Sequence, residues 1–544
     1  MRTKLKAIGM NTSRLGLGAV ALLAALCMLY LFLSSMMSTA DMSTANEMKE
    51  MITFEEDSLG LNVLLLLAFL FVGGIFTLTV RRLGWLDKLP PRKLAFAVWL
   101  WVVLAGSAWV LMSMSSPTHD SLIVTRAGVA AALDEMKYLQ EDYFMRFPFQ
   151  SGYVLWTELW ARLFDLNHKN YIILEMINVI CLAFGEWALV LTADRLFRRR
   201  EVTMVTAIML CLFIQPMIFS TFLYGNIPGF CFACLAIYLF TEYLARDRWG
   251  WLAGAGACLL VSITLKLNNM ILLVAMCIIL LAHLLRGKPL RRALALILLC
   301  AAIIPLSNAP QWYYEKRLDK ELGEGIPMTS WLAMGLNESL IAPGWYNGKY
   351  TVTNFHAVDM DTDAASERSK EEIRKRLEHF REDPEDARGF FEEKILSQWN
   401  ETTFQSIWTN QVRGQFMSRV GFAKYACEEE EGKVKAVMDL GVQFIYFGML
   451  AAAIYLLFEQ INKKETRRAV EPALYLIPLI FLGGFLYHAL FEAKSQYVIT
   501  YVTLMIPYAA WGICRLFSDG KAAAVSFMGS KAYANLKSKV KKAK

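Results

Sequence analysis

The sequence predicts an all-α polytopic membrane protein with about 12 transmembrane helices. Hydrophobic residues make up 56% of the 544 residues and charged residues only 19%, whereas a soluble domain carries about a quarter charged residues. The apolar residues form runs of roughly 17–24, long enough to cross about 30 Å of hydrocarbon as helices. The net charge of +7 is concentrated in short segments between these runs, which is typical of membrane orientation and excludes a nucleic-acid-binding surface.

The apolar runs define the predicted spans. The first run follows a basic N-terminus and is longer than a typical signal-peptide core, so we expect a retained first helix. The next run follows after a short acidic segment, and the remaining runs are separated by either short basic segments or two long polar loops. The predicted spans are residues 15–34, 61–80, 95–114, 171–193, 202–219, 227–244, 250–266, 269–285, 290–307, 439–458, 472–490 and 496–513.

Charge distribution predicts the orientation. The segment 35–60 contains one lysine and six acidic residues, whereas alternate short segments are rich in Lys and Arg. Cytoplasmic loops carry such an excess of positive charge, so we predict a cell-membrane protein with both termini in the cytoplasm and an even number of spans. The basic segments are 81–93, 195–200, 245–248, 286–292 and 462–468, together with the C-terminal tail.

This topology places two long loops, 115–170 and 308–438, outside the cytoplasm. The cytoplasmic loops are too short to form a site, so we predict an extracytoplasmic one. The expected organisation is an N-terminal two-helix membrane addition (1–94), a membrane core containing the first outer loop (95–307), a large extracytoplasmic domain (308–438), C-terminal membrane helices (439–514) and a basic cytoplasmic tail (515–544).

The two outer loops are expected to be mainly α-helical. In the stretch 149–166, Tyr153, Trp156, Trp160 and Phe164 recur at helical spacing with Glu158 and Arg162 opposite, which predicts an interfacial helix with its aromatic side towards the membrane. Charges alternate along 364–381, which predicts a solvated helix that ends before Asp383-Pro384. A second amphipathic helix is expected at 387–399, with Phe390, Ile395 and Trp399 on the core.

Asp120 is the first candidate for chemistry. It follows Pro117-Thr118-His119 directly after the third span, where a carboxylate is within reach of both water and lipid headgroups. The alternative is that Asp120 caps the next helix, a position that Asp favours. The other acidic residues of this loop, including Glu141 and Asp142, are expected to be mainly solvated surface.

Two lysines at the outer ends of spans are the second candidates. Lys266 lies between two apolar runs and Lys494 at the start of the last span, where a cation opposes the usual orientation bias. One interpretation is that their ammonium groups extend to the lipid headgroups. The other is a clamp for a lipid phosphate, formed together with Arg126 or Arg146.

No metal site is predicted. Asp359, Asp361 and Asp363 are similar to the start of an EF-hand loop, but Ala364 replaces the glycine at position six and Lys370 the glutamate at position twelve. The histidines show no metal-ligand spacing, and no cofactor is required by the sequence, although a divalent cation stays an open alternative. A glycine-rich nucleotide loop is also lacking, which argues against a nucleotide-sugar donor.

The order of these features resembles the C-type (GT-C) integral-membrane glycosyltransferases, which include protein O-mannosyltransferases, aminoarabinose transferases of lipid A and bacterial envelope enzymes. The resemblance covers roughly 95–515 and leaves the first two spans as an addition. It rests on the segments PTHDSLIVTRAGVAA (117–131), the run from Tyr143 to Asn178, YGNIPG (224–229), TLKLNN (264–269), SWLAMGLNESLIAPGWYNGKY (330–350), KILSQWNETTFQSIW (394–408) and FEAKSQYV (491–498).

Membership would imply an inverting transfer, on the outer face, of a sugar from a polyprenyl-phosphate donor to an envelope glycan, glycolipid or protein. Asp120 would be the general base, and Lys266 and Lys494 would stabilise the leaving phosphate. Many relatives have Arg where this chain has Gln496, so Lys494 would carry more of the phosphate contact. Many also have a second acid beside the base, a position that Glu141 or Asp142 would have to fill here.

Two other functions stay open. A polymerase or ligase of surface polysaccharide would also bind lipid phosphates. A transporter or flippase has the same number of spans, but such transporters repeat six plus six with a long cytoplasmic loop at the midpoint. Here the sixth and seventh runs are joined by only a short segment, ARDRWG, and the long loops are asymmetric.

Overall fold

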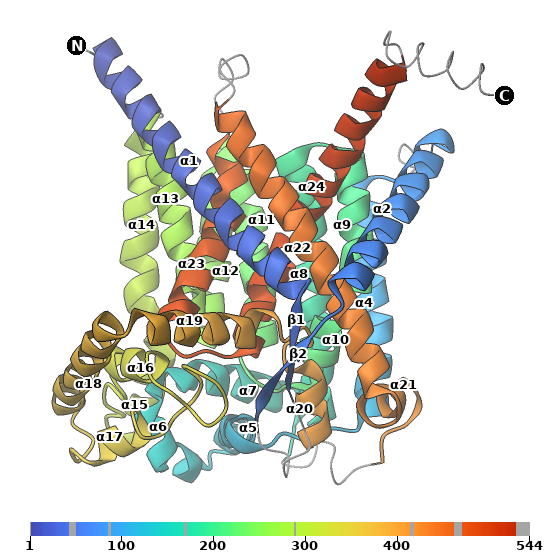
Figure 1. Cartoon of the computed structure of the whole chain (residues 1–544). Helices are drawn as coiled ribbons and strands as arrows, with labels where there is room; N and C mark the ends of the chain where they lie inside the picture. Colours follow the sequence, from blue (N-terminus) through green and yellow to red (C-terminus); the bar gives the residue numbers. More distant parts are fainter. Residues whose placement is uncertain are drawn as a thin grey trace.

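The computed structural model describes residues 2–42, 50–84, 89–167, 171–287, 290–413, 418–461 and 471–528. Across these residues the protein is almost entirely helical, with a single two-stranded sheet. Long helices form a membrane bundle, and the short helices of residues 119–164 and 309–429 cover one end of it (Figure 1). We call this covering of short helices the cap layer. The predicted all-α polytopic membrane fold is confirmed.

Helices coincide with all the predicted spans. In the described ranges, ten helices are long and apolar enough to cross a membrane, or eleven if the pair Arg200–Leu212 and Gln215–Thr221, bent by 43°, counts as one span. The apolar helix Trp249–Leu265 is shorter, at 17 residues. The membrane helices are α1 (Arg2–Ser35), α2 (Leu59–Arg82), α4 (Pro91–Ser113), α8 (Ile172–Phe197), α9 (Arg200–Leu212), α10 (Gln215–Ile218), α11 (Asn226–Arg246), α12 (Trp249–Leu265), α13 (Met270–Leu285), α14 (Leu290–Leu306), α22 (Glu431–Ile461), α23 (Leu476–Leu490) and α24 (Ser495–Met528).

The start of α1 and the end of α24 lie at the same end of the bundle, away from the cap layer (Figure 1). This arrangement fits an even number of spans. The basic segment 462–468 and the end of the predicted tail lie outside the described residues. Which face of the membrane the termini occupy stays a prediction from the distribution of charge.

The bundle is held together by close helix packing. α8 contacts α4, α9 and α11, while α24 packs against α22 and α9, and α1 against α22 and α23. Gly448 and Gly512 allow α22 and α24 to approach closely, because a Cβ on either glycine would overlap the backbone of the other helix. Small residues serve this purpose in membrane bundles, where the hydrophobic effect does not drive helices together.

The first part of the cap layer follows α4. Its helix α7 coincides with the predicted interfacial helix, and Phe164 is exposed while Trp156 and Trp160 are half-buried. The prediction that Glu158 lies on the exposed polar side of this helix is wrong, because Glu158 is 2% exposed. Its carboxylate accepts from Tyr314 Oη at 2.6 Å and pairs with Arg317 at 2.7 Å, so partners distant in sequence compensate the buried charge. The elements are α5 (His119–Ala132), η1 (Met136–Gln140), α6 (Asp142–Arg146), η2 (Pro148–Gln150) and α7 (Ser151–Phe164).

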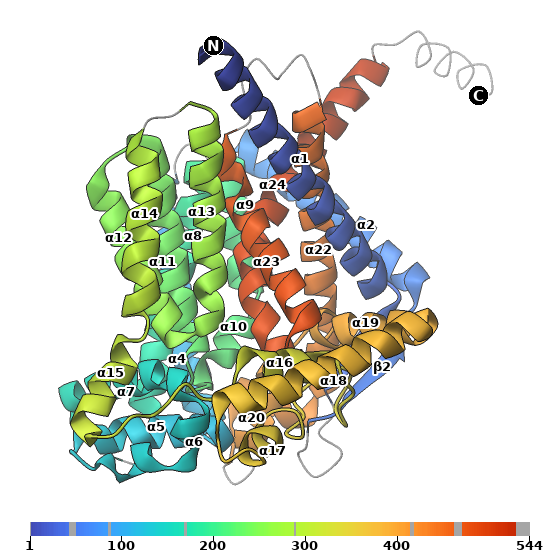
Figure 2. The same cartoon turned by 90° about the vertical axis from the view of Figure 1, so that its left-hand side faces the viewer.

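The second part of the cap layer lies between α14 and α22. The two predicted helices are present as α18 and α19, which lie beneath the membrane bundle in Figure 2. Asp361 caps α18 by accepting from the Ala364 amide, and Asp383 caps α19, which begins at Pro384. The elements are α15 (Ala309–Leu318), α16 (Met328–Gly335), α17 (Val352–His356), α18 (Thr362–Glu382), α19 (Pro384–Trp399), α20 (Ser406–Arg413), α21 (Gly421–Lys424) and the π-helix η5 (Tyr425–Glu429).

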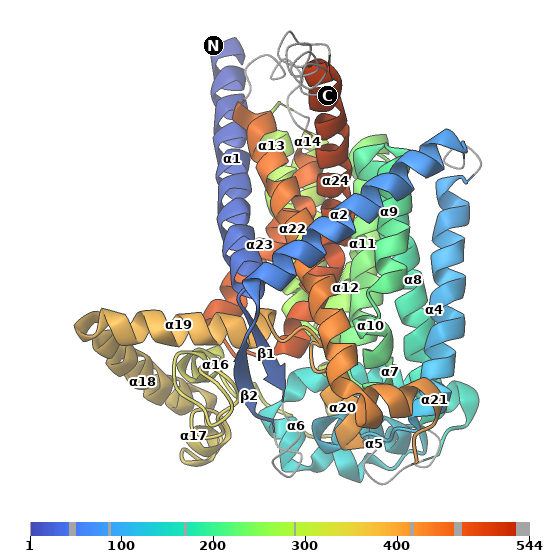
Figure 3. The ribbon, with the colours of Figure 1, turned by 45° about the vertical axis from the view of Figure 1, so that its right-hand side comes forward.

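A β-hairpin between α1 and α2 was not predicted from the sequence. Strands β1 (Ser38–Met42) and β2 (Ile52–Glu56) pair antiparallel, and they extend from the ends of α1 and α2 into the cap layer (Figure 3). Ala40 and Met42 are buried there against Trp345 and Ala493. The N-terminal addition is therefore more than two membrane helices, because its hairpin is part of the cap layer.

Candidate functional site

Lys266 lies in a break between two membrane helices. α12 ends at Leu265, Lys266 is extended, and the short 3-10 turn η4 (Leu267–Asn269) leads into α13. Gly152 and Gly225 make room for this break, because a Cβ on either would overlap the backbone carbonyl of Thr264 or Leu265. Parts of three segments that carried the family resemblance, around Gly152, Gly225 and Lys266, therefore meet at one place.

The Lys266 ammonium lies against two tyrosine rings. It is 5.1 Å from the centroid of Tyr224 and 4.6 Å from that of Tyr497. Within the described ranges, this ammonium makes no hydrogen bond and no ion pair. Aromatic faces attract a cation without neutralising it. The site therefore presents a positive charge that is available to an anion.

Lys494 lies in the turn between α23 and α24. Its ammonium is 2.7 Å from Glu50 Oε1, and both side chains are mostly buried. Burial by itself lowers the pKa of Lys494, but the negative charges of Glu50, Glu492 and Asp120 outweigh burial and raise it. These charges favour the ammonium form of Lys494, and unlike Lys266 this lysine has a carboxylate in direct contact.

The turn that carries Lys494 is anchored from the cap layer. Lys394 of α19 is fully buried, and its ammonium donates to the carbonyl oxygens of Gly335 and, at 2.8 Å, Phe491. Burial lowers the pKa of Lys394 to about 7. This lysine thus joins α16, α19 and the turn between α23 and α24, and it fixes the position of Lys494.

Asp120 is the second residue of α5. Thr118 occupies the N-cap position, without a side-chain capping hydrogen bond, and Asp120 lies inside the first turn, so the alternative role of Asp120 as the cap is not observed. Asp120 is exposed, and its carboxylate has no hydrogen-bond or ion-pair partner among the described residues. Although it is accessible, surrounding protein removes part of its hydration, which raises the pKa of Asp120, while the charges of Lys494, His119 and Arg146 act in the opposite direction. Such a carboxylate is suited to accept a proton.

Besides Asp120, two carboxylates lie around Lys494, those of Glu50 and Glu492. Glu492 accepts from Tyr497 Oη at 3.1 Å. Burial raises the pKa of Glu492, and Lys494, Tyr497 and Lys266 act in the opposite direction. Together with Glu50 and Asp120, Glu492 gives the site three carboxylates and two lysines that interact electrostatically.

Of the two predicted arginines, Arg146 joins this group and Arg126 does not. The charge of Arg146 acts on Asp120, and its guanidinium pairs with Asp142 at 3.0 Å. Asp142 also lies 3.2 Å from His356 Nε2, so it holds Arg146 and does not stand beside Asp120 as a second acid. Arg126 is exposed. Its guanidinium lies over the ring of Tyr138 and donates to the Tyr138 Oη at 2.5 Å.

Glu141 is also separate from the group. It is exposed and precedes α6, and none of its contacts within the described ranges involves Asp120. The carboxylates whose charges act on Asp120 or on Lys494 are instead Glu50 and Glu492. The assignment of a second acid to Glu141 or Asp142 stays a prediction from the resemblance.

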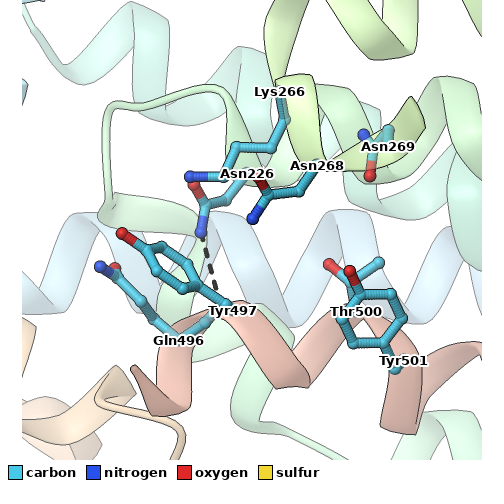
Figure 4. Close-up of a pocket in the computed structure, with 8 residues that line it drawn as sticks. All are labelled: Asn226, Lys266, Asn268, Asn269, Gln496, Tyr497, Thr500 and Tyr501. Carbon is cyan, nitrogen blue, oxygen red and sulfur yellow. Dashed lines mark hydrogen bonds between the residues drawn. The ribbon is translucent and has the colours of Figure 1, made fainter. Parts of the chain in front are cut away.

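A small pocket opens beside Lys266. Figure 4 shows Lys266, Asn226 and Asn268 converging on Tyr497 and Gln496 of α24. Asn226 Nδ2 donates to the Gln496 carbonyl at 3.5 Å, which joins the start of α11 to the start of α24. The lining consists of side-chain amides, hydroxyls and one cation: Asn226, Lys266, Asn268, Asn269, Gln496, Tyr497, Thr500 and Tyr501. Such groups supply the kinds of donor and acceptor with which phosphate oxygens and sugar hydroxyls form hydrogen bonds.

Sequence reasoning missed Glu50, Glu492, Tyr224 and Tyr497. Three of them lie within segments that carried the resemblance, so inspection of the residues around Lys494 and of YGNIPG could have found them. Glu50 has no such signal, because its partner is more than four hundred positions away. Across the described ranges, no group of three or more His, Cys, Asp or Glu side chains is placed to hold a metal ion.

The arrangement combines a free carboxylate with two cations at the ends of membrane helices. Residues 148–314 match the family model described as dolichyl-phosphate-mannose-protein mannosyltransferase, a GT-C family. The predicted GT-C resemblance is thereby confirmed, and the match indicates a GT-C-type glycosyltransferase. It includes Lys266 and Tyr224 but neither Asp120 nor Lys494. The comparison with curated proteins gives no match.

Proposed function

We propose that the protein is an inverting glycosyltransferase that moves a sugar from a polyprenyl-phosphate donor to a hydroxyl of a cell-envelope acceptor. The observation that carries this proposal is the combination of an unpaired, accessible carboxylate, Asp120, with Lys266 and Lys494 in breaks between membrane helices. A lipid-linked donor needs its chain in the bilayer and its phosphate at the membrane edge. Lys266 and Lys494 lie at the end of the bundle where such a phosphate would be.

In the proposed reaction, the acceptor hydroxyl loses its proton to Asp120 as its oxygen attacks C1 of the sugar. The bond between C1 and the phosphate oxygen breaks, and its electron pair leaves with the lipid phosphate. This phosphate changes from a diester with one negative charge to a monoester with a second developing charge. Two fixed ammonium groups stabilise that charge more in the transition state than in the bound donor, which is the requirement for catalysis.

A single displacement inverts the configuration at C1. It needs one base and no nucleophilic side chain, and Asp120 satisfies this requirement. Because the base must be unprotonated, activity falls as the pH decreases through the pKa of Asp120. Partial desolvation raises this pKa, so the acidic limb of the pH profile is expected above the range of an unperturbed aspartate.

Asp120→Asn tests the proposal. We expect transfer from a radiolabelled polyprenyl-phosphate-sugar to decrease at least about 100-fold, because general base catalysis contributes this much or more. Binding of the donor should be retained. Asp134→Asn is the matched control, since Asp134 follows the opposite end of α5 and is exposed. Undiminished transfer by Asp120→Asn would contradict the role of Asp120 as base.

A further inference from the structure

Glu50, a residue of the N-terminal addition, reaches the site. Its Oε1 lies 2.7 Å from the ammonium of Lys494 and accepts from Gln405 Nε2 at 3.1 Å. The Glu50 side chain is 16% exposed and that of Lys494 18%. A charge pair shielded from water to this degree is stronger than an exposed pair, and the extra hydrogen bond fixes its geometry.

The hairpin next to Glu50 is firmly attached to the cap layer. Ala40 donates its amide to the carbonyl of Asn400 at 3.0 Å, and Asn400 Nδ2 donates to the carbonyl of Ser38 at 3.0 Å. Lys435 pairs with Asp41 at 2.6 Å. On β2, Ile52 donates to the carbonyl of Ile341 at 3.4 Å. These contacts, made to α22 and to segments flanking α16 and α19, hold the backbone near Glu50.

Gln405 is fixed by a buried turn between α19 and α20. Glu401 is 1% exposed, and its carboxylate accepts from the amide of Thr403 at 3.2 Å and from the amide of Gln405 at 2.6 Å. Phe404 and Gln405 both have left-handed backbone conformations, with φ of 51° and 60°. Residues other than glycine rarely adopt this backbone conformation, so surrounding contacts must maintain it at Phe404 and Gln405. The donor to Glu50 is therefore held in place independently of Glu50.

We propose that Glu50 is a positioning residue of the transferase: it holds the ammonium of Lys494 in place and thereby leaves Asp120 unpaired and available to the acceptor. This inference rests on the proposed function. It makes the N-terminal addition a part of the catalytic site, although that segment lies outside the residues that resemble the family.

The consequence of removing Glu50 follows from the charges around Lys494. Its electrostatic partners are Glu50, Glu492 and Asp120, and of these only Glu50 forms an ion pair with it in the structure. Without Glu50, Lys494 would turn to the two remaining carboxylates. A Lys494–Asp120 pair would make the base less basic, and the loss of the negative charge of Glu50 would act in the same direction, because that charge raises the pKa of Asp120.

The groups that act on Asp120 come from several elements. His119 lies beside it on α5, Arg146 on α6, and Lys266 and Lys494 in the two breaks between membrane helices. Four phenols also lie within the electrostatic reach of Asp120, but they are uncharged where Asp120 titrates; these are Tyr143, Tyr224, Tyr346 and Tyr497. Glu50→Gln leaves all of these groups in place, so a changed pH profile would report the removal of a single charge.

The test compares transfer by the full-length wild type, Glu50→Gln and Glu50→Asp across a range of pH. We expect Glu50→Gln to decrease kcat about tenfold, which corresponds to one charge-assisted hydrogen bond. The acidic limb of the pH profile of Glu50→Gln should move to lower pH, because Asp120 holds its proton less tightly in this variant. Glu50→Asp keeps the charge, so its acidic limb should stay with that of the wild type even if kcat decreases.

Asp41→Asn is the matched control. It removes another lysine–carboxylate pair of the same hairpin, the one with Lys435, without altering the charges around Asp120. If Asp41→Asn moves the acidic limb as far as Glu50→Gln does, or if Glu50→Gln leaves it unchanged while the wild type is active, Glu50 is not a positioning residue. If the wild type transfers no sugar from a lipid-phosphate donor, the proposed function fails and the inference with it.

Discussion

The two lysines of the site differ in what surrounds them. Lys266, in the break between α12 and α13, lies between two tyrosine rings and has no anionic group in contact within the described residues. Lys494, in the turn between α23 and α24, is paired with Glu50 at 2.7 Å. An incoming phosphate would meet no carboxylate of the described residues in contact with Lys266, whereas it would have to share Lys494 with Glu50. We infer that Lys266 contributes most to binding of the donor and that Lys494 adjusts the charge near Asp120.

The largest effect is expected from Lys266→Ala. It removes the cation that no carboxylate of the described residues contacts, so kcat/KM for the donor should decrease about 100-fold to 1,000-fold, as for other groups that stabilise a developing charge. The measurement is initial rates of transfer at several donor concentrations. Lys370→Ala, on the exposed surface of α18, is the control. A loss below about tenfold would show that Lys266 only reaches towards the headgroups.

Lys494→Ala is expected to have a smaller effect, about tenfold weaker donor binding. The change leaves Glu50 without its partner, and the exposed negative charge repels the phosphate. Adding Glu50→Gln removes this repulsion, so the double variant should bind the donor better than Lys494→Ala alone. The measurement is the affinity of the wild type, both single variants and the double variant for a fluorescent polyprenyl phosphate, which together form a double-mutant cycle. The same addition to Lys266→Ala should give no recovery, and equal recovery in both backgrounds would remove the distinction between the lysines.

The smallest effects concern the arginines. Arg146 acts electrostatically on Asp120 but is shared with Asp142, so Arg146→Ala should decrease kcat/KM by roughly threefold to tenfold. Arg126 is exposed and occupied by Tyr138, so Arg126→Ala should change kcat/KM by less than about twofold. Rate measurements on both variants in parallel test this. A larger loss for Arg126 than for Arg146 would place the donor on the other side of α5.

Much of the fold follows from local sequence. Span positions depend on the length of apolar runs, which the bilayer thickness imposes. The boundaries of α18 and α19 follow from Asp361, Asp383 and Pro384, whose capping chemistry acts within three residues. The first strand of the hairpin has a weaker signal. Thr39 is the only β-branched or aromatic residue in Ser38–Met42, and this strand is held by contacts to distant segments such as Asn400.

The candidate site shows the same division. Asp120, Lys266 and Lys494 could be found because a charge beside an apolar run is conspicuous wherever it occurs. Glu50 and the buried Glu158 could not, because their partners are brought to them by the tertiary fold. Glu158 is paired with Arg317, and Glu50 with Lys494, across long stretches of chain. A carboxylate that such a partner neutralises cannot be distinguished in the sequence from one on the surface.

The most direct measurement of the central claim is the configuration at C1 of the transferred sugar, determined by NMR on the isolated product and compared with that of the polyprenyl-phosphate donor. The account predicts inversion, since Asp120 serves as a single base and the lipid phosphate leaves in one displacement between Lys266 and Lys494. Retention of configuration, or a product formed equally well without a lipid-phosphate donor, would contradict it.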